Sequence, residues 1–208
     1  MKFSKYKTVL QFSEQELIEK HSRFISSSAP VHTQDEALSF LSNVKHKYPD
    51  AKHHVYAYCL FKDGRKRFSD DGEPSGTAGK PVLDVIEKNE IYDVIVVVTR
   101  YFGGVLLGTG GLVHAYSHSA KLAVEASKIV TMRLCSVAEI ACDYGQYQGF
   151  ERILKENRAV IDAVDFTENV KILFHLALNE LENVNRQLME SSGGKVQAIA
   201  QREEFLPF

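Results

Sequence analysis

The pattern of apolar and polar positions predicts that strands and helices alternate along the chain. One helical stretch, residues 34–48, carries apolar residues at helical spacing: Ala37, Leu38, Leu41 and Val44. A different pattern, the continuous run from Val94 to Val98, consists of β-branched residues only. Such a run is typical of a strand that is buried on both faces. The first two thirds of the chain therefore predict a mixed domain built around at least one fully buried strand.

Shorter signals predict the remaining elements of this first part. We expect strands near residues 8–12, from 23 to Pro30 and over 54–61, and a turn or short helix over 14–19. Proline is favoured in the first turn of a helix, so a helix is expected from Pro81. A long helix is expected over 112–128, with a packed side at Leu112, Ala115, Ser119, Leu122 and Ala126.

The pattern restarts near Met132, where the expected order of elements is βαββαβ. The expected segments are a strand over 135–142, a helix over 147–156, a hairpin of 160–166 with 170–178, a helix from Leu181 that Gly193-Gly194 ends, and a last strand over 196–200. This order predicts a ferredoxin-like domain. The fold class is therefore α+β, with two domains at 1–131 and 132–208.

Charge and cysteine content narrow the class of protein. The net charge of −2 argues against a basic arm that coats nucleic acid. Residues 1–131 carry 17 Lys and Arg against 15 Asp and Glu, and residues 132–208 carry 8 against 12, so a local phosphate site is better sought in the first part.

The cysteines and the apolar runs predict the compartment. The chain has three cysteines and no C-x-x-C pair, which predicts a reduced protein. It shows no signal peptide and no apolar run of membrane length, so we expect a cytoplasmic protein with no membrane partner.

Glycine-rich loops mark the candidate site. Eight of the thirteen glycines fall within residues 70–111, and two of the loops run into expected helix starts. A helix N-terminus favours anions, so the two starts could converge on a phosphate or carboxylate. The candidate binding residues are Asp70, Asp71, Glu73, Ser75, Gly76, Thr77, Gly79, Lys80, Arg100, Tyr101, Gly103, Gly104, Gly108 and Gly110.

Each of these features also has a purely structural interpretation. The carboxylates of Asp70, Asp71 and Glu73 could hold Mg²⁺, or they could form a solvated acidic turn. Arg100 could fork onto a phosphate, or it could pair with an acidic residue such as Asp71 while Phe102 packs in the core. The glycine, serine and threonine residues at the helix starts could serve as ordinary caps.

Several familiar catalytic motifs are absent. Pro74 and Pro81 break the phosphate-binding P-loop pattern around Gly79-Lys80, and no G-x-G-x-x-G follows the Val94–Val98 strand. His114 and His118 have zinc-compatible spacing but no evident third ligand, and Ser117 and Ser119 beside them form no hydrolase motif. We therefore predict no catalytic residue, no bound metal and no cofactor.

One run of residues resembles a known family. The chain carries Gly79-x-x-Val82-Leu83-x-x-Ile86, then Ile91, then Val97-Val98-x-Arg100-Tyr101-Phe102-Gly103-Gly104-x-x-Leu107-Gly108. This run resembles the signature of the IMPACT family in its bacterial two-domain form, and residues 132–200 resemble the smaller second domain more weakly. The resemblance implies that the first domain has the fold of the second domain of ribosomal protein S-five. It also implies a ferredoxin-like second domain, in the order found in elongation factor G.

The resemblance directs the functional prediction toward translation, because eukaryotic members of the family are translation regulators. Those members carry an additional N-terminal module that this sequence does not show before its core domain, so their protein partner is not carried over. We predict a non-enzymatic cytoplasmic protein that binds RNA or the ribosome. One alternative is an enzyme acting on a small phosphorylated or carboxylated substrate, with Mg²⁺ at the acidic loop. Another is a protein-interaction module that uses the second domain.

Overall fold

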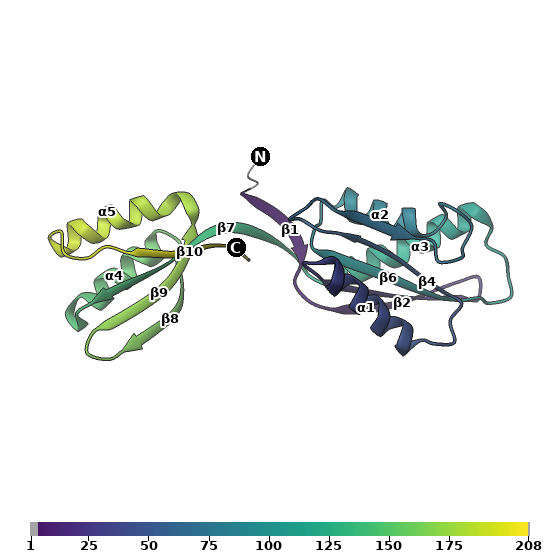
Figure 1. Cartoon of the computed structure of the whole chain (residues 1–208), viewed down its shortest axis with the longest axis horizontal. Coiled ribbons are helices and arrows are strands. Elements are labelled where there is room, and N and C mark those ends of the chain that lie inside the picture. The colour runs from purple at the N-terminus through teal and green to yellow at the C-terminus, as the bar shows by residue number, and fades with distance from the viewer. Residues whose placement is uncertain (1–3, 208) are drawn as a thin grey trace. The chain divides into compact units, whose positions relative to one another are not determined.

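Two sheets organise the chain (Figure 1). The computed structural model describes residues 4–207, and within them the chain divides into two compact units. One unit is Tyr6–Thr131; the other comprises the described residues from Met132 onward together with Ser4 and Lys5. Each sheet combines with helices in the same unit, which confirms the predicted α+β class.

The sheet of the first unit has the strand order β2-β3-β6-β4-β5, and its neighbouring strands run antiparallel. Its members are β2 (Ser13–Glu19), β3 (Ser22–Pro30), β6 (Val94–Tyr101), β4 (His53–Cys59) and β5 (Lys66–Ser69). The middle strand is β6, and it ends at the residues that lead into the second glycine-rich loop. The sheet thereby fixes where that loop leaves the core.

The central strand β6 contributes to two apolar layers, one on each face of the sheet. Val94, Val96 and Val98 pack in a cluster with buried residues of α2 (Gly79–Lys88) and α3 (Gly108–Ala126). Ile95 and Val97 pack in a second cluster with α1 (Gln34–Lys47). Figure 1 shows α1 on one side of the sheet and α2 with α3 on the other. The predicted burial of this strand on both faces is confirmed.

The structure differs from the sequence-based elements near the N-terminus. Residues 14–19, expected as a turn or short helix, belong to strand β2, because the whole segment pairs with β3 from Ser13↔Ser28 to Glu19↔Ser22. The first strand, β1 (Lys5–Val9), begins earlier than expected. The short strand β5 was not predicted; its residues pair with β4 at the edge of the sheet.

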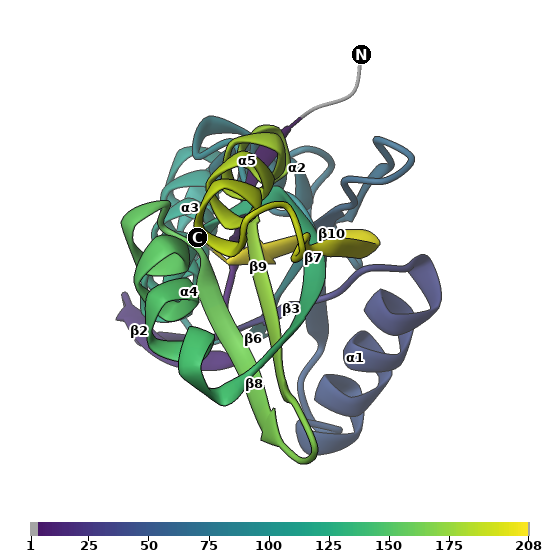
Figure 2. The ribbon, with the colours of Figure 1, turned by 90° about the vertical axis from the view of Figure 1, so that its left-hand side faces the viewer.

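The second unit has the predicted element order βαββαβ. The elements are β7 (Ile129–Cys142), α4 (Tyr144–Glu156), β8 (Val160–Phe166), β9 (Val170–Ala177), the short 3₁₀ helix η1 (Leu178–Glu180), α5 (Leu181–Ser192) and β10 (Ile199–Pro207). The strands lie in the order β10-β7-β9-β8, and β1 joins the same sheet at β7. Buried side chains of α4 and α5 pack in one cluster with β7 and β9, and Figure 2 shows the β8–β9 hairpin beside these helices.

The last strand lies further along the chain than expected. The sequence indicated residues 196–200, whereas β10 runs from Ile199 to Pro207. The amides of Val196 and Ala198 donate to the side chains of Ser192 (3.0 Å) and Asn185 (2.7 Å). These backbone donors are thus satisfied by α5, and sheet pairing starts only after them.

Among the described residues, no helix has the length and apolar character needed to cross a membrane.

Candidate functional site

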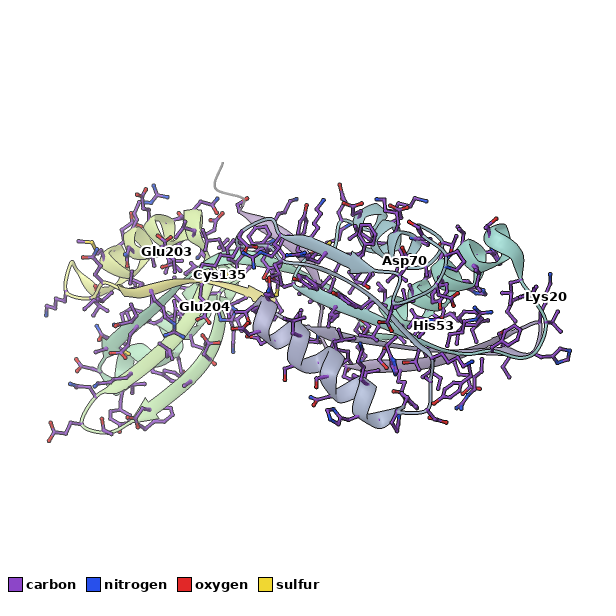
Figure 3. The ribbon with its side chains drawn as sticks, turned by 45° about the vertical axis from the view of Figure 1, so that its right-hand side comes forward. Lys20, His53, Asp70, Cys135, Glu203 and Glu204 are labelled. Atoms are coloured by element: carbon purple, nitrogen blue, oxygen red, sulfur yellow. The ribbon has the colours of Figure 1, made fainter. Side chains whose placement is uncertain are left out.

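The acidic loop before α2 is organised by the carboxylate of Asp70, which Figure 3 labels. It accepts hydrogen bonds from the amides of Gly76 (2.9 Å), Ala78 (3.1 Å) and Gly79 (2.8 Å). The amides of Ala78 and Gly79 lie at the start of the helix, where the partial positive charge favours an anion, and that of Gly76 lies in the loop before it. The anion found there is a side chain of the same chain, so these donors are already engaged.

Close packing explains one of the glycines in this loop. A Cβ atom on Gly79 would lie 2.6 Å from the backbone carbon and oxygen of Ser69. Thr77 is buried and its hydroxyl donates to the carbonyl of Pro74 at 2.7 Å. Ser75 and Gly76 are exposed at the tip of the loop. Residues 77–79 of the loop are therefore buried, whereas residues 74–76 are open to solvent.

Asp71 connects the acidic loop to the start of β4. Its carboxylate accepts the amide of His54 at 2.6 Å and lies 3.6 Å from the ammonium of Lys45. Its carbonyl oxygen lies 2.8 Å from Nδ1 of His53, the other residue labelled in this region of Figure 3. Burial lowers the pKa of His54, which favours the neutral imidazole. Asp71 thus fixes the loop to the sheet.

The third carboxylate of the loop is buried. Glu73 accepts a hydrogen bond from Nη1 of Arg100 at 2.7 Å, and the two side chains are 4% and 8% exposed. The same carboxylate oxygen accepts the hydroxyl of Tyr116 at 2.7 Å. Burial, together with the nearby Glu73, raises the pKa of Tyr116 far above its usual value, so the hydroxyl stays a donor. The alternative in which Arg100 pairs with an acidic residue is therefore confirmed, but the partner is Glu73 and not Asp71.

The remaining surroundings of Arg100 are aromatic and polar. Its guanidinium carbon lies 5.5 Å from the ring centre of Phe24 and 5.6 Å from that of Phe102. Its Nη2 donates to the hydroxyl of Ser22 at 3.4 Å. The guanidinium is held inside the fold by these groups, and its charge is directed to Glu73. This geometry gives Arg100 a positioning role at the start of the second loop.

Lys80 and Tyr101 also have partners within the protein. The ammonium of Lys80 lies 2.7 Å from Asp84 and 3.5 Å from Glu87, on its own helix. The hydroxyl of Tyr101 donates to Asp50 at 2.7 Å. Desolvation and the Asp50 carboxylate raise the pKa of Tyr101 to about 12. Both side chains are thus engaged by carboxylates of the same chain.

The second glycine-rich loop is attached to the β2–β3 hairpin. Gly103 donates its amide to the hydroxyl of Ser22 at 3.2 Å, and a Cβ atom there would lie 2.0 Å from the backbone of His21. Only glycine fits this contact without a shift of the backbone. Figure 3 shows Lys20, the residue before His21, at the tip of that hairpin. The loop and the hairpin tip therefore lie side by side.

Beyond Gly103 the residues up to Gly110 are exposed apart from Leu107, which is buried. Gly104 and Gly108 have positive φ angles of 83° and 73°, and nothing lies within 4 Å of a Cβ built on either of them. No side chain caps the start of α3, which follows Leu107. Phe102 is 55% exposed and Leu106 is 83% exposed. We call Phe102, Leu106, Gly108 and Gly110 the α3 N-terminal surface. The exposure of Phe102 corrects the expectation that it packs in the core.

The two glycine-rich segments meet, but through a buried ion pair. Glu73 comes from the first segment and Arg100 stands at the start of the second. The amides of the first segment are engaged by Asp70, whereas the start of α3 has no side-chain cap. The amides of the first segment are therefore not free for the single anion surface that we expected both segments to form, and an anion site at the start of α3 stays a prediction.

The magnesium alternative also loses its ligand set. Asp70, Asp71 and Glu73 each accept hydrogen bonds in a different direction, from loop amides, from β4 and from Arg100. The described residues hold no group of three or more His, Cys, Asp or Glu side chains arranged to bind a metal ion. This finding covers His114 and His118 as well.

Two contributors to the site were missed in the sequence. Ser22 bonds both to Arg100 and to the amide of Gly103, and Tyr116 bonds to Glu73. Tyr116 lies on the packed side of α3, one residue after the predicted core position Ala115. A tyrosine on the packed side of a helix needs a buried hydrogen-bond partner for its hydroxyl, and this requirement could have indicated a polar group in the core. Nothing comparable marks Ser22.

Comparisons with known proteins match both units. The family model described as Impact N-terminal domain matches residues 20–124, and the Domain of unknown function (DUF1949) matches residues 140–195. IMPACT family member YvyE of Bacillus subtilis (strain 168) is 34% identical over 91% of this chain and 88% of its own. IMPACT family member YigZ of Escherichia coli (strain K12) is 34% identical over 88% of this chain and 92% of its own.

A solved structure is similar over nearly the whole length. It is described as the crystal structure of an hypothetical protein, is 31% identical, and has a TM-score of 0.62 over 97% of this chain and 100% of that one. Together with the relatives, this similarity extends across both units. The chain belongs to the IMPACT family, as its motifs indicated.

Proposed function

We propose that this IMPACT family member is a non-enzymatic cytoplasmic protein that binds RNA on the ribosome and thereby regulates translation. The contact is made by the α3 N-terminal surface. The observation that carries this proposal is the exposure of Phe102 (55%) and Leu106 (83%) beside a helix start without a side-chain cap. Single-stranded RNA recognition uses aromatic rings as stacking platforms, and the N-terminus of a helix can bind a phosphate.

The chemistry of the contact follows from these groups. A base stacks on the ring of Phe102, since every base offers a π face. A phosphate accepts hydrogen bonds from the amides at Gly108 and Gly110, where the helix dipole favours negative charge. The open space around Gly104 and Gly108 lets a nucleic-acid backbone approach closely. Lys20, on the adjoining hairpin tip, is exposed and adds a positive charge.

The buried pair of Arg100 and Glu73 positions this surface. Arg100 ends near the ring of Phe102, and Gly103 is held to the hairpin through Ser22. The pair therefore holds the loop from beneath while the exposed residues make the contact. Membership of the IMPACT family supports the link to translation, because eukaryotic members of that family are translation regulators.

Sedimentation with ribosomes tests the proposal. Cell lysate containing the tagged protein is separated on a sucrose gradient, and the purified protein is titrated with a fluorescent 12-nucleotide single-stranded RNA at two salt concentrations. We expect co-sedimentation, and we expect Phe102→Ala with Leu106→Ser to weaken RNA binding at least tenfold. Affinity should fall as salt rises, because phosphate contacts release counterions.

Phe12→Ala is the matched control, because Phe12 is 54% exposed in the same unit and outside the α3 N-terminal surface. It should leave both sedimentation and RNA affinity within twofold of the unmodified protein. Equal losses in the control and in the double variant, or a protein that stays at the top of the gradient and binds no RNA, would contradict the proposal.

A further inference from the structure

A groove between α2 and α3 carries a cluster of basic and polar side chains outside the surface described above. Its volume is about 440 Å³. From the end of α2 come Lys88 and Asn89, and from the middle of α3 come His114, Ser117, His118 and Lys121. None of these residues belongs to the α3 N-terminal surface, so the inference below does not rest on the proposed function.

The described residues that line the groove are positive or neutral, and none is acidic. Lys88 comes from α2 and Lys121 from α3, so each helix contributes a positively charged side chain to the lining. Lys121 also lies 3.7 Å from Glu125, but both side chains are more than half exposed, so that ion pair contributes little. The groove therefore attracts negative charge.

The two histidines add hydrogen-bond donors rather than a metal site. Their ring centres are 5.9 Å apart on successive turns of α3. Zinc in proteins takes at least three side-chain ligands, and the other lining residues supply no further histidine, cysteine or carboxylate. Two ammonium groups at the same place would also repel a divalent cation. An imidazole donates one hydrogen bond when neutral and two when protonated, which suits an anion.

We propose that this groove binds a nucleotide unit through its phosphate. Lys88 and Lys121 contact the phosphate, and Ser117 and Asn89 donate hydrogen bonds to its oxygens or to the sugar. The imidazole rings and the side chain of Val85, which also lines the groove, provide a partly apolar wall for the base. The volume lies within the range of small-ligand sites, about 300–1,000 Å³.

A nucleotide unit could come from a free nucleotide or from an RNA strand, and the experiment separates the two sources. The full-length protein is titrated with inorganic phosphate, with uridine and adenosine monophosphates, and with a 12-nucleotide single-stranded RNA. Calorimetry serves for the small probes and fluorescence polarisation for the RNA. The test variant is Lys88→Ala with Lys121→Ala, and a second variant is His114→Ala with His118→Ala.

The control variant is Lys62→Ala with Lys171→Ala, which removes the same charge from exposed positions outside the groove. We expect the Lys88/Lys121 variant to lose at least tenfold in affinity, the histidine variant at least threefold, and the control less than twofold. Loss confined to the monophosphates identifies a free nucleotide as the ligand, and loss confined to the RNA identifies a strand.

Two results would overturn the inference. One is that neither the monophosphates nor the RNA bind the unmodified protein at millimolar concentration. The other is binding that the groove variants and the control weaken equally. If the groove variants keep both monophosphate binding and RNA binding while Phe102→Ala/Leu106→Ser loses RNA binding, the groove proposal fails and the proposed function stands.

Discussion

Arg100 and Glu73 form an ion pair of 2.7 Å between side chains that are 8% and 4% exposed, and this pair joins the two glycine-rich loops. A buried pair is costly to form, and removal of one partner is costlier because it leaves an unpaired charge in the interior. Loss of either partner is therefore expected to destabilise the fold by more than loss of an exposed ion pair of the same length.

We expect Arg100→Ala to reduce the free energy of unfolding by about 3–5 kcal/mol, because Glu73 stays buried without its cation. Urea unfolding followed by circular dichroism measures the change, since the chain has no tryptophan. The control is Arg23→Ala, which breaks a 2.8 Å pair with Glu16 whose side chains are 49% and 43% exposed. That exposed pair should contribute at most about 1 kcal/mol. Equal effects of the two variants would show that the buried pair has no special role.

Removal of the Asp70 carboxylate should free two amides at the start of α2 and the loop amide of Gly76. We expect Asp70→Ala to reduce the free energy of unfolding by about 2 kcal/mol, the upper range for loss of a helix N-terminal cap. Asp70→Asn should cost less, because one acceptor oxygen remains for Ala78 and Gly79. The comparison is Asp63→Ala, which removes an exposed turn contact to the amide of Arg65 and an exposed 3.2 Å ion pair with the same residue. A cost for Asp70→Ala no larger than for Asp63→Ala would contradict this account of the loop.

Two glycines of the second segment should respond oppositely to alanine. At Gly103 a Cβ would lie 2.0 Å from the backbone of His21, so we expect Gly103→Ala to destabilise the protein by about 1–3 kcal/mol. At Gly110, inside α3, no atom lies within 4 Å of that position. Gly110→Ala should therefore raise stability by about 0.5–1 kcal/mol through helix propensity. Thermal unfolding of the two variants under identical conditions provides the measurement. Destabilisation by both would show that Gly110 has a contact that the structure lacks.

The three cysteines are buried and free, so we expect them to resist a thiol reagent in the folded protein. Burial raises the pKa of the Cys59 thiol from its usual 9.0 to about 11. Because the folded pKa is the higher one, the contribution of this thiol to stability is complete below pH 9 and is lost as the pH rises through 11. At pH 8 an aromatic disulfide reagent should titrate no thiol in the native protein and all three in guanidinium chloride. Rapid reaction of one thiol in the native state would contradict the burial.

The sequence predicts most of the helices and the central strand because their signals are local. Val94–Val98 needs no partner to be recognised, and the spacing of Ala37, Leu41 and Val44 fixes the packed face of α1. Residues 13–19 differ, because that segment carries three glutamates and becomes a strand only by pairing with β3. Tertiary pairing decides such segments, and local propensity does not.

The candidate site is harder to predict for the same reason. The sequence identified the loops but not the partners of their charged residues. The partner of Arg100 lies 27 residues away in the chain, and Asp70 binds amides at the start of α2. Glu73 and Asp71 are both acidic residues of one short run, so the sequence does not distinguish their roles. In the fold the carboxylate of Glu73 points to the buried Tyr116, and that of Asp71 points to β4. Exposure of Phe102 likewise depends on Gly103, whose contact with His21 fixes the direction of the loop.

The alternation of side chains along β6 has a consequence for mutational analysis. Ile95 and Val96 are neighbours in the chain, yet one belongs to the apolar layer under α1 and the other to the layer under α2 and α3. Truncation of Ile95 and, separately, of Val96 can therefore show how far each apolar layer has formed in the transition state for folding. Two positions one peptide bond apart give two independent probes of the order in which the helices dock.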